Sequence, residues 1–230
     1  MEFRTLKANE IDCRIAQIDK GWLTLLLYKD ARVDMDILDE TVGCLNWKRE
    51  HLRENANCRV SIWNPEIKEW ISKEDTGTES FSEAEKGLAS DSFKRACVNW
   101  GIGRELYSSP SIFVFPRKDI LYRYDGREVE EFYLNKRDKY ETKTRFYVDY
   151  IDYDNNREVQ NLIIRDNKNN VRFTQLTEEF EKQNLEEEIK IQKINDDTRE
   201  RIYKKYNIDS LEKLTISQRR EILNDLSKDE

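Results

Sequence analysis

The residues of this chain best suited to binding chemistry are two adjacent cations, Lys94 and Arg95, in the segment LASDSFKRACVNWGIGRELY, residues 88–107. They belong to a stretch, residues 86–118, with six basic and two acidic side chains, in a chain whose net charge is −7. A locally positive stretch on an acidic protein is typical of a surface that holds a polyanion. The basic residues are Lys86, Lys94, Arg95, Arg104, Arg117 and Lys118.

A helix must present these cations. Apolar residues recur at spacings of three and four, which predicts an amphipathic helix ended by Gly101 or Gly103. Lys86 and Lys94 fall along one edge of this helix, away from the apolar stripe. Arg95 follows Asp91 by four residues, so an ion pair is expected to neutralise it in part. Charge alone favours an ordinary solvated helix face. The stripe consists of Ala89, Phe93, Ala96, Cys97 and Trp100.

The residue types argue against several classes of enzyme. One histidine, His51, leaves little room for triad chemistry, and no glycine begins a GxxxxGK[ST] loop for ATP. The four cysteines lack CxxC spacing, so neither a zinc site nor a disulfide framework is expected. We therefore expect no catalytic residues, no metal and no cofactor, and reduced thiols in a cytoplasmic protein.

The residues before the helix alternate between strand and helix patterns. Segments 10–18 and 22–28 are predicted strands, and residues 30–43 a helix that stops at Gly43. Residues 46–54, NWKREHLRE, are predicted to form a charged strand that carries Lys48 and Arg49, with Arg49, His51 and Arg53 on one face. NCRVSIW and IKEWISK then form a hairpin through Asn64 and Pro65.

The composition changes along the second half of the chain. Residues 117–145 are polar and weakly periodic, and residues 146–173 predict two or three antiparallel strands with Asn-rich turns. After Leu176 the chain becomes acidic and helical, ending in two short helices with a small leucine and isoleucine cluster. We predict a core over 1–120, a β-rich extension over 121–176 and an acidic helical tail over 177–230.

The order of short motifs in the first half resembles the RAD-fifty-two superfamily of single-strand annealing proteins, and within it the Sak-type recombinases of phages. The likeness covers residues 8–110 and rests on order and spacing, because each motif alone is weak. The matching motifs are Arg32, Leu38-Asp39-Glu40, Gly43, Asn46-Trp47, Asp75-Thr76-Gly77, Ser90-Asp91, Lys94-Arg95-Ala96, Trp100-Gly101-Ile102-Gly103-Arg104 and Tyr107.

This resemblance implies an α+β fold with a β-β-β-α annealing core, an antiparallel sheet packed on a long helix, followed by a C-terminal hairpin and helical extension. It also implies a homo-oligomeric ring or helical filament that binds single-stranded DNA in a basic groove and anneals strands without ATP. The protein would act in homologous recombination and repair, in the host cytoplasm if a phage encodes it, with no membrane partner.

The resemblance also assigns DNA-binding residues. Arg32 and Lys94 align with a groove arginine and a helix lysine of the family. Arg95 is a weaker candidate for DNA binding, because its expected pair with Asp91 gives it a structural role. Lys86 and Arg104 are placed to extend the line of DNA contacts along the basic groove. Lys48 and Arg49 rest on strand alternation alone. Trp47, Phe93 and Trp100 are expected in the core, as is Tyr107, although it could stack on a base. Cys44 and Leu45 stand where animal members have an aromatic residue, which leaves no stacking role there.

Two other functions stay open. Glu66-Ile-Lys68 mimics the E-x-K triplet of metal-dependent nucleases, a triplet that is frequent in a chain this charged. Alternatively, the chain is an adaptor that acts through its C-terminal helices. Within the annealing hypothesis, those helices are expected to bind a single-strand binding protein or a partner exonuclease as an appendage.

Overall fold

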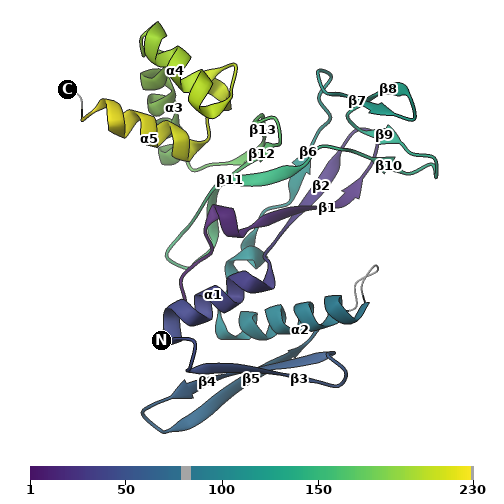
Figure 1. Ribbon diagram of the computed structural model, residues 1–230, viewed down its shortest axis with the longest axis vertical. Coiled ribbons are helices and arrows are strands. Elements are labelled where there is room, and N and C mark those ends of the chain that lie inside the picture. The colour runs from purple at the N-terminus through teal and green to yellow at the C-terminus, as the bar shows by residue number, and fades with distance from the viewer. Residues whose placement is uncertain (79–83, 229–230) are drawn as a thin grey trace. The chain divides into compact units, whose positions relative to one another are not determined.

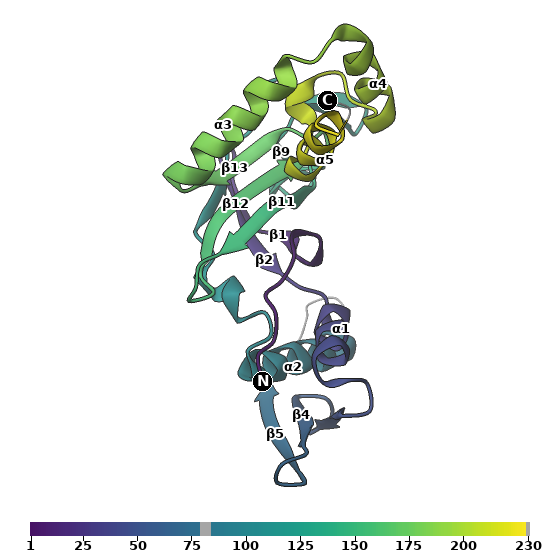
Figure 2. The ribbon, with the colours of Figure 1, turned by 90° about the vertical axis from the view of Figure 1, so that its left-hand side faces the viewer.

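The computed structural model describes residues 1–78 and 84–228, with the side chains of residues 84–86 outside that description. The chain divides into two compact units, residues 1–10 with 29–108 and residues 11–28 with 109–230 (Figures 1 and 2). Each unit contains its own antiparallel sheet. The predicted functional boundaries near 120 and 176 stay predictions, because compactness alone does not test them.

The first unit is built on a three-stranded sheet covered by a long helix. The sheet order is β3-β4-β5, and α2 packs on one of its faces, with α1 packed against α2 (Figure 1). The bounds are η1 (Ala8–Glu10), α1 (Ala31–Val42), β3 (Trp47–Leu52), β4 (Asn57–Asn64), β5 (Glu69–Thr76), α2 (Ala84–Trp100) and η2 (Arg104–Ser108).

Alternation along β4 explains why α2 packs where it does. Cys58, Val60 and Ile62 point to one face and are buried, opposite the buried Phe93 and Cys97 of α2. The predicted amphipathic helix is confirmed, including its end at Gly101, whose φ is 100°. Phe93 is fully buried as expected, whereas Trp47 and Trp100 are half-buried.

Helix α1 has defined signals at both ends. The Asp30 side chain accepts a hydrogen bond from the Arg32 backbone N–H, and the Gly43 N–H donates to the Asp39 carbonyl oxygen. Gly43 adopts a φ of 86°, a conformation that favours glycine. Trp47 Nε1 then donates to Asp39 Oδ1 at 2.6 Å, which fixes the start of β3 against the end of α1.

The second unit is built on a six-stranded antiparallel sheet of order β13-β12-β11-β1-β2-β6. Two small hairpins, β7-β8 and β9-β10, occupy the region that the sequence left without assignment. Two or three strands were expected over residues 146–173, and the structure has three, β11, β12 and β13. The bounds are β1 (Asp12–Ile18), β2 (Leu23–Tyr28), β6 (Ile112–Val114), β7 (Leu121–Tyr124), β8 (Arg127–Glu130), β9 (Tyr133–Leu134), β10 (Tyr140–Glu141), β11 (Phe146–Tyr153), β12 (Val159–Asp166) and β13 (Val171–Gln175).

Four helical segments follow the sheet: α3 (Glu178–Gln192), α4 (Asp196–Tyr206), the 3-10 turn η3 (Leu211–Lys213) and α5 (Ile216–Leu226). The first of the two short terminal helices is therefore a single 3-10 turn. The expected apolar cluster is confirmed, and it also draws in residues of α3 and α4. Its buried members are Ile191, Ile202, Leu211, Leu214 and Ile222.

Buried Arg165 ties these helices to the sheet. Its Nε donates to Asp149 Oδ2 at 2.6 Å, and its Nη atoms donate to the backbone carbonyls of Glu212 and Leu214 at 3.0 and 2.9 Å. Asp149 also accepts from the Ile216 N–H at 3.3 Å. A buried guanidinium needs such partners, because an unpaired buried charge is costly. The C-terminal helices are thus built into the second unit, and the α+β fold expected from the sequence is confirmed.

Candidate nucleic-acid interface

Lys94 lies on α2, the helix against which α1 packs, and is half-buried there. It forms no ion pair or hydrogen bond with another residue in the described part of the chain. Its charge nevertheless acts on Asp34 of α1, whose pKa it helps to hold down. Lys94 therefore lies near the contact between the two helices and is not held in an ion pair among the described residues.

Arg32 lies on the first turn of α1. Its side chain is 85% exposed, and Nε stands 3.6 Å from Asp30 Oδ1, a loose pair between two solvated groups. Arg32 is two residues from Asp34, to which Lys94 is coupled electrostatically. The structure thus brings the two strongest sequence candidates to the neighbouring helices α1 and α2.

Lys29 and Asp34 form a buried ion pair that was not predicted from the sequence. Lys29 Nζ donates to Asp34 Oδ1, and the two residues are 4% and 0% exposed. The Lys29 side chain runs directly over Gly103, where a Cβ atom would overlap its Cδ and Cε atoms. Gly103 also has a φ of 70°. The second glycine of the Gly-x-Gly therefore makes room for a buried lysine in addition to ending a helix.

Asp34 is held in an unusual electrostatic setting. Burial raises its pKa to about 6, against the opposing charges of Lys29 and Lys94. Its second oxygen, Oδ2, is buried and makes no hydrogen bond within the described residues. Cys97 of α2 lies in the same environment, where burial and then the charge of Asp34 raise the pKa of its thiol.

Arg95 is largely committed to its own helix. Its Nε donates to Asp91 Oδ2 at 3.0 Å, the i,i+4 pair that the spacing predicts. Asp91 also accepts from the Thr78 N–H at 2.9 Å. Although burial opposes it, hydrogen bonds from Thr78 and Arg95 lower the pKa of Asp91. Arg95 therefore has an alternative structural role, as expected.

Arg104 caps the C-terminal end of α2. Its Nη2 donates to the carbonyls of Val98 and Asn99 at 3.0 and 3.2 Å. Lys73 of β5 donates to the same Asn99 carbonyl at 2.8 Å and lies 4.7 Å from the Trp100 ring centroid. Two cations thus satisfy the helix terminus, where positive charge is favourable. This capping role was missed, because nothing in the sequence pairs β5 with the end of α2.

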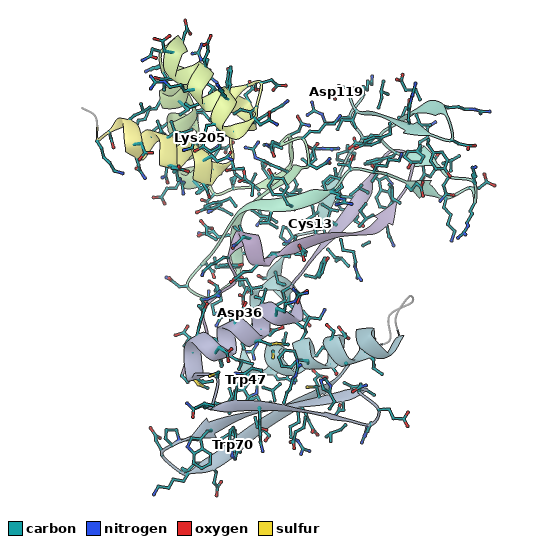
Figure 3. The ribbon with its side chains drawn as sticks, viewed as in Figure 1. Cys13, Asp36, Trp47, Trp70, Asp119 and Lys205 are labelled. Carbon is teal, nitrogen blue, oxygen red and sulfur yellow. The ribbon has the colours of Figure 1, made fainter. Side chains whose placement is uncertain are left out.

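Lys48 and Arg49 point to opposite faces of the three-stranded sheet. The Arg49 guanidinium lies 4.9 Å from the Phe93 ring centroid, on the face covered by α2. Lys48 lies 4.9 Å from the Trp70 ring centroid, on the other face. Figure 3 labels Trp47 and Trp70, which mark these two faces. The structure therefore does not bring Lys48 and Arg49 together.

The remaining sequence candidates divide as follows. Lys86 lies in the first turn of α2, and its side chain is outside the described part of the structure. Tyr107 is 73% exposed, so the expectation that it is buried is wrong. Arg53 belongs to the β3–β4 turn with a φ of 51° and does not extend the strand face. Ser92 of α2 is buried and donates to the Asn55 carbonyl at 3.0 Å.

No helix in the described residues is long and apolar enough to cross a membrane. Nor do three or more His, Cys, Asp or Glu side chains gather there in a way that could hold a metal ion. All four cysteines are free thiols: Cys58 and Cys97 are buried, Cys13 is half-buried and Cys44 is exposed.

Comparison with known proteins identifies one family. Residues 20–119 match the model of the Rad52/22 family double-strand break repair protein. The curated proteins contain no match, and neither do the solved structures. The matched range includes α1, β3, β4, β5 and α2, which carry Arg32 and Lys94. Over residues 20–119, the chain is therefore similar to the Rad52/22 family of double-strand break repair proteins.

Proposed function

We propose that this protein binds single-stranded DNA and anneals complementary strands without ATP, as a homo-oligomeric ring or filament. Arg32 and Lys94 supply the central phosphate contacts. The further candidates for DNA contact are Arg95, Lys86, Arg104, Lys48 and Arg49. The protein is not an enzyme in this proposal, and it acts in the cytoplasm. The Sak-type phage recombinases are the branch that its motifs resemble.

The observation that carries the proposal is that Lys94 and Arg32 lie on neighbouring helices inside the matched family range. Lys94 forms no ion pair among the described side chains, although its charge acts on Asp34, and Arg32 has only a loose pair at 3.6 Å. Cations on neighbouring helices that are not held in close ion pairs suit the spaced phosphates of a nucleic-acid backbone. By contrast, Arg95 and Arg104 already have internal partners.

Annealing needs no cofactor because duplex formation is downhill. The protein lowers the barrier by neutralising phosphates and holding two strands extended. Binding of this kind releases counterions, so affinity falls with salt, with a slope of about −0.7 per phosphate contact for single strands. An oligomer extends the contact path beyond the few cations that one copy offers.

The direct test is an annealing assay with two complementary labelled oligonucleotides, without ATP or magnesium, alongside negative-stain microscopy with and without single-stranded DNA. We expect annealing well above the spontaneous rate, and rings or filaments in the micrographs. Monomers that fail to accelerate annealing would overturn the proposal.

The nuclease alternative rests on Glu66 and Lys68. Both lie in the exposed turn that joins β4 to β5, and Lys68 has a φ of 55°. Magnesium-dependent cleavage of labelled DNA, lost in Glu66→Gln, would establish the nuclease activity.

In the adaptor alternative, the C-terminal helices alone carry the function of the protein. This alternative predicts no DNA binding at any salt concentration.

A further inference from the structure

A groove between α4 and α5 has an apolar floor and a basic rim. Its volume is about 170 Å³, enough for one large apolar side chain. Ile202 and Ile222 form the buried floor, together with the half-buried Leu226. Arg201 and Lys205 of α4 are exposed on the rim, one helical turn apart. Thr198, Tyr206 and Asp225 complete the lining.

The charge around this groove differs from that of the rest of the C-terminal segment. Helix α4 contains four basic side chains and three acidic, whereas α3 contains six acidic and two basic. An acidic ligand is therefore repelled by α3 and attracted to α4. Arg201 donates only to the Asp197 carbonyl, at 3.3 Å, within the described residues, so its charge is uncompensated there. Lys205 shares its charge with Glu221 at 2.9 Å.

The groove is also held rigidly enough to act as a binding site. The apolar cluster of α3, α4, η3 and α5 lies directly beneath it, and Arg165 fixes η3 and the residues before α5 to the sheet. Figure 3 labels Lys205 on this helical cluster. A preformed groove loses little conformational freedom on binding.

We propose that the α4–α5 groove binds a short acidic peptide segment of a partner protein, with one large apolar side chain in the groove and carboxylates against Arg201 and Lys205. This inference deepens the partner role proposed for the C-terminal helices, and it involves no contact with DNA.

The test uses the full-length protein without DNA and a fluorescein-labelled hexapeptide of four aspartates followed by leucine and phenylalanine. Fluorescence anisotropy should show saturable binding. We expect no binding when the two apolar residues of the peptide are serines, and none when its aspartates are lysines. Arg201→Glu should weaken binding by about tenfold or more, because it reverses charge at the rim.

Two further variants separate the groove from general electrostatics. Lys204→Glu makes the same charge change on the same helix outside the groove lining, and it should change affinity by less than about twofold. Thr198→Trp fills the groove without a change of charge and should abolish binding, with the fold checked by circular dichroism. Equal losses in Arg201→Glu and Lys204→Glu, or unaltered binding by Thr198→Trp, would overturn the inference. Because DNA is absent, failure here leaves the annealing proposal intact, and failure of annealing leaves this one intact.

Discussion

Lys29 and Asp34 form an ion pair that is almost completely removed from solvent, and the side chain of Lys29 reaches it across Gly103. This pair lies beside Lys94, whose charge also acts on Asp34. It connects the Gly-x-Gly motif to the proposed DNA surface. The packing of Lys29 against Gly103 and the charge of Asp34 can each be tested separately.

Gly103→Ala should destabilise the protein more than Gly101→Ala. Both glycines have a positive φ, of 70° and 100°, so both substitutions introduce backbone strain of about 1 kcal/mol or more. Only at Gly103 would the new Cβ overlap Lys29, whereas nothing lies within 4 Å of a Cβ at Gly101. Urea unfolding of the two variants should differ by about 1–3 kcal/mol. Equal losses would show that Lys29 does not need the space.

Lys29→Met should cost about 3–5 kcal/mol of unfolding free energy at pH 7.5, because it leaves Asp34 of α1 buried without a cation. Asp36→Asn, on the exposed side of the same helix, should stay within about 0.5 kcal/mol of the wild type (Figure 3). The double variant Lys29→Met with Asp34→Asn should recover most of the loss. A double variant no more stable than Lys29→Met alone would contradict the pairing.

Stability should also depend on pH through Asp34. Burial raises the pKa of Asp34 to about 6, above its unfolded value, so folding favours its protonated form. Its contribution is complete below about pH 4 and is lost as pH rises through about 6. The difference in unfolding free energy between the wild type and the Lys29→Met, Asp34→Asn double variant should therefore change across this window. A constant difference would contradict the assignment.

DNA binding should respond to the same proton. Protonation of Asp34 removes a negative charge next to Lys94, so affinity for an oligothymidine should rise as pH falls from 7.5 to 5.5. The double variant should show less of this rise. His51 also titrates, and burial and then Arg49 lower its pKa, so its contribution is common to both proteins and cancels in the comparison. Parallel pH profiles would exclude an influence of Asp34 on the DNA surface.

Removal of residues 177–230 should destabilise the second unit. The deletion takes away two carbonyl partners of Arg165, those of Glu212 and Leu214, and the Ile216 N–H that donates to Asp149. It also uncovers Ile163, which packs with Phe180 and Ile216. Thermal unfolding should shift down by several degrees. An unchanged midpoint would mean that the helices contribute nothing to the sheet, and the truncated protein would then be the right form in which to assay annealing.

Periodicity predicted most of the elements, because α1, α2 and the strands of both sheets other than β6 have clear apolar patterns and end signals such as Gly43. The Asp91–Arg95 pair followed from helical spacing alone. Contacts between distant segments could not be found in this way. Lys29 with Asp34, Arg104 with the end of α2, and Arg165 with η3 depend on tertiary packing, which no local spacing encodes. The two faces of β3 separated Lys48 from Arg49, as alternation requires.

The most direct test of the central claim is the salt dependence of single-stranded DNA binding by the wild type, Lys94→Gln and Arg32→Gln, with Lys68→Gln in the exposed β4–β5 turn as the matched control. We expect Lys94→Gln and Arg32→Gln each to weaken binding and to reduce the slope of log affinity against log salt by about 0.7, with the unfolding free energy unchanged for the exposed Arg32→Gln. Lys68→Gln should leave both quantities at the wild-type value. Slopes and affinities that are the same in all four proteins would contradict the assignment of DNA to α1 and α2.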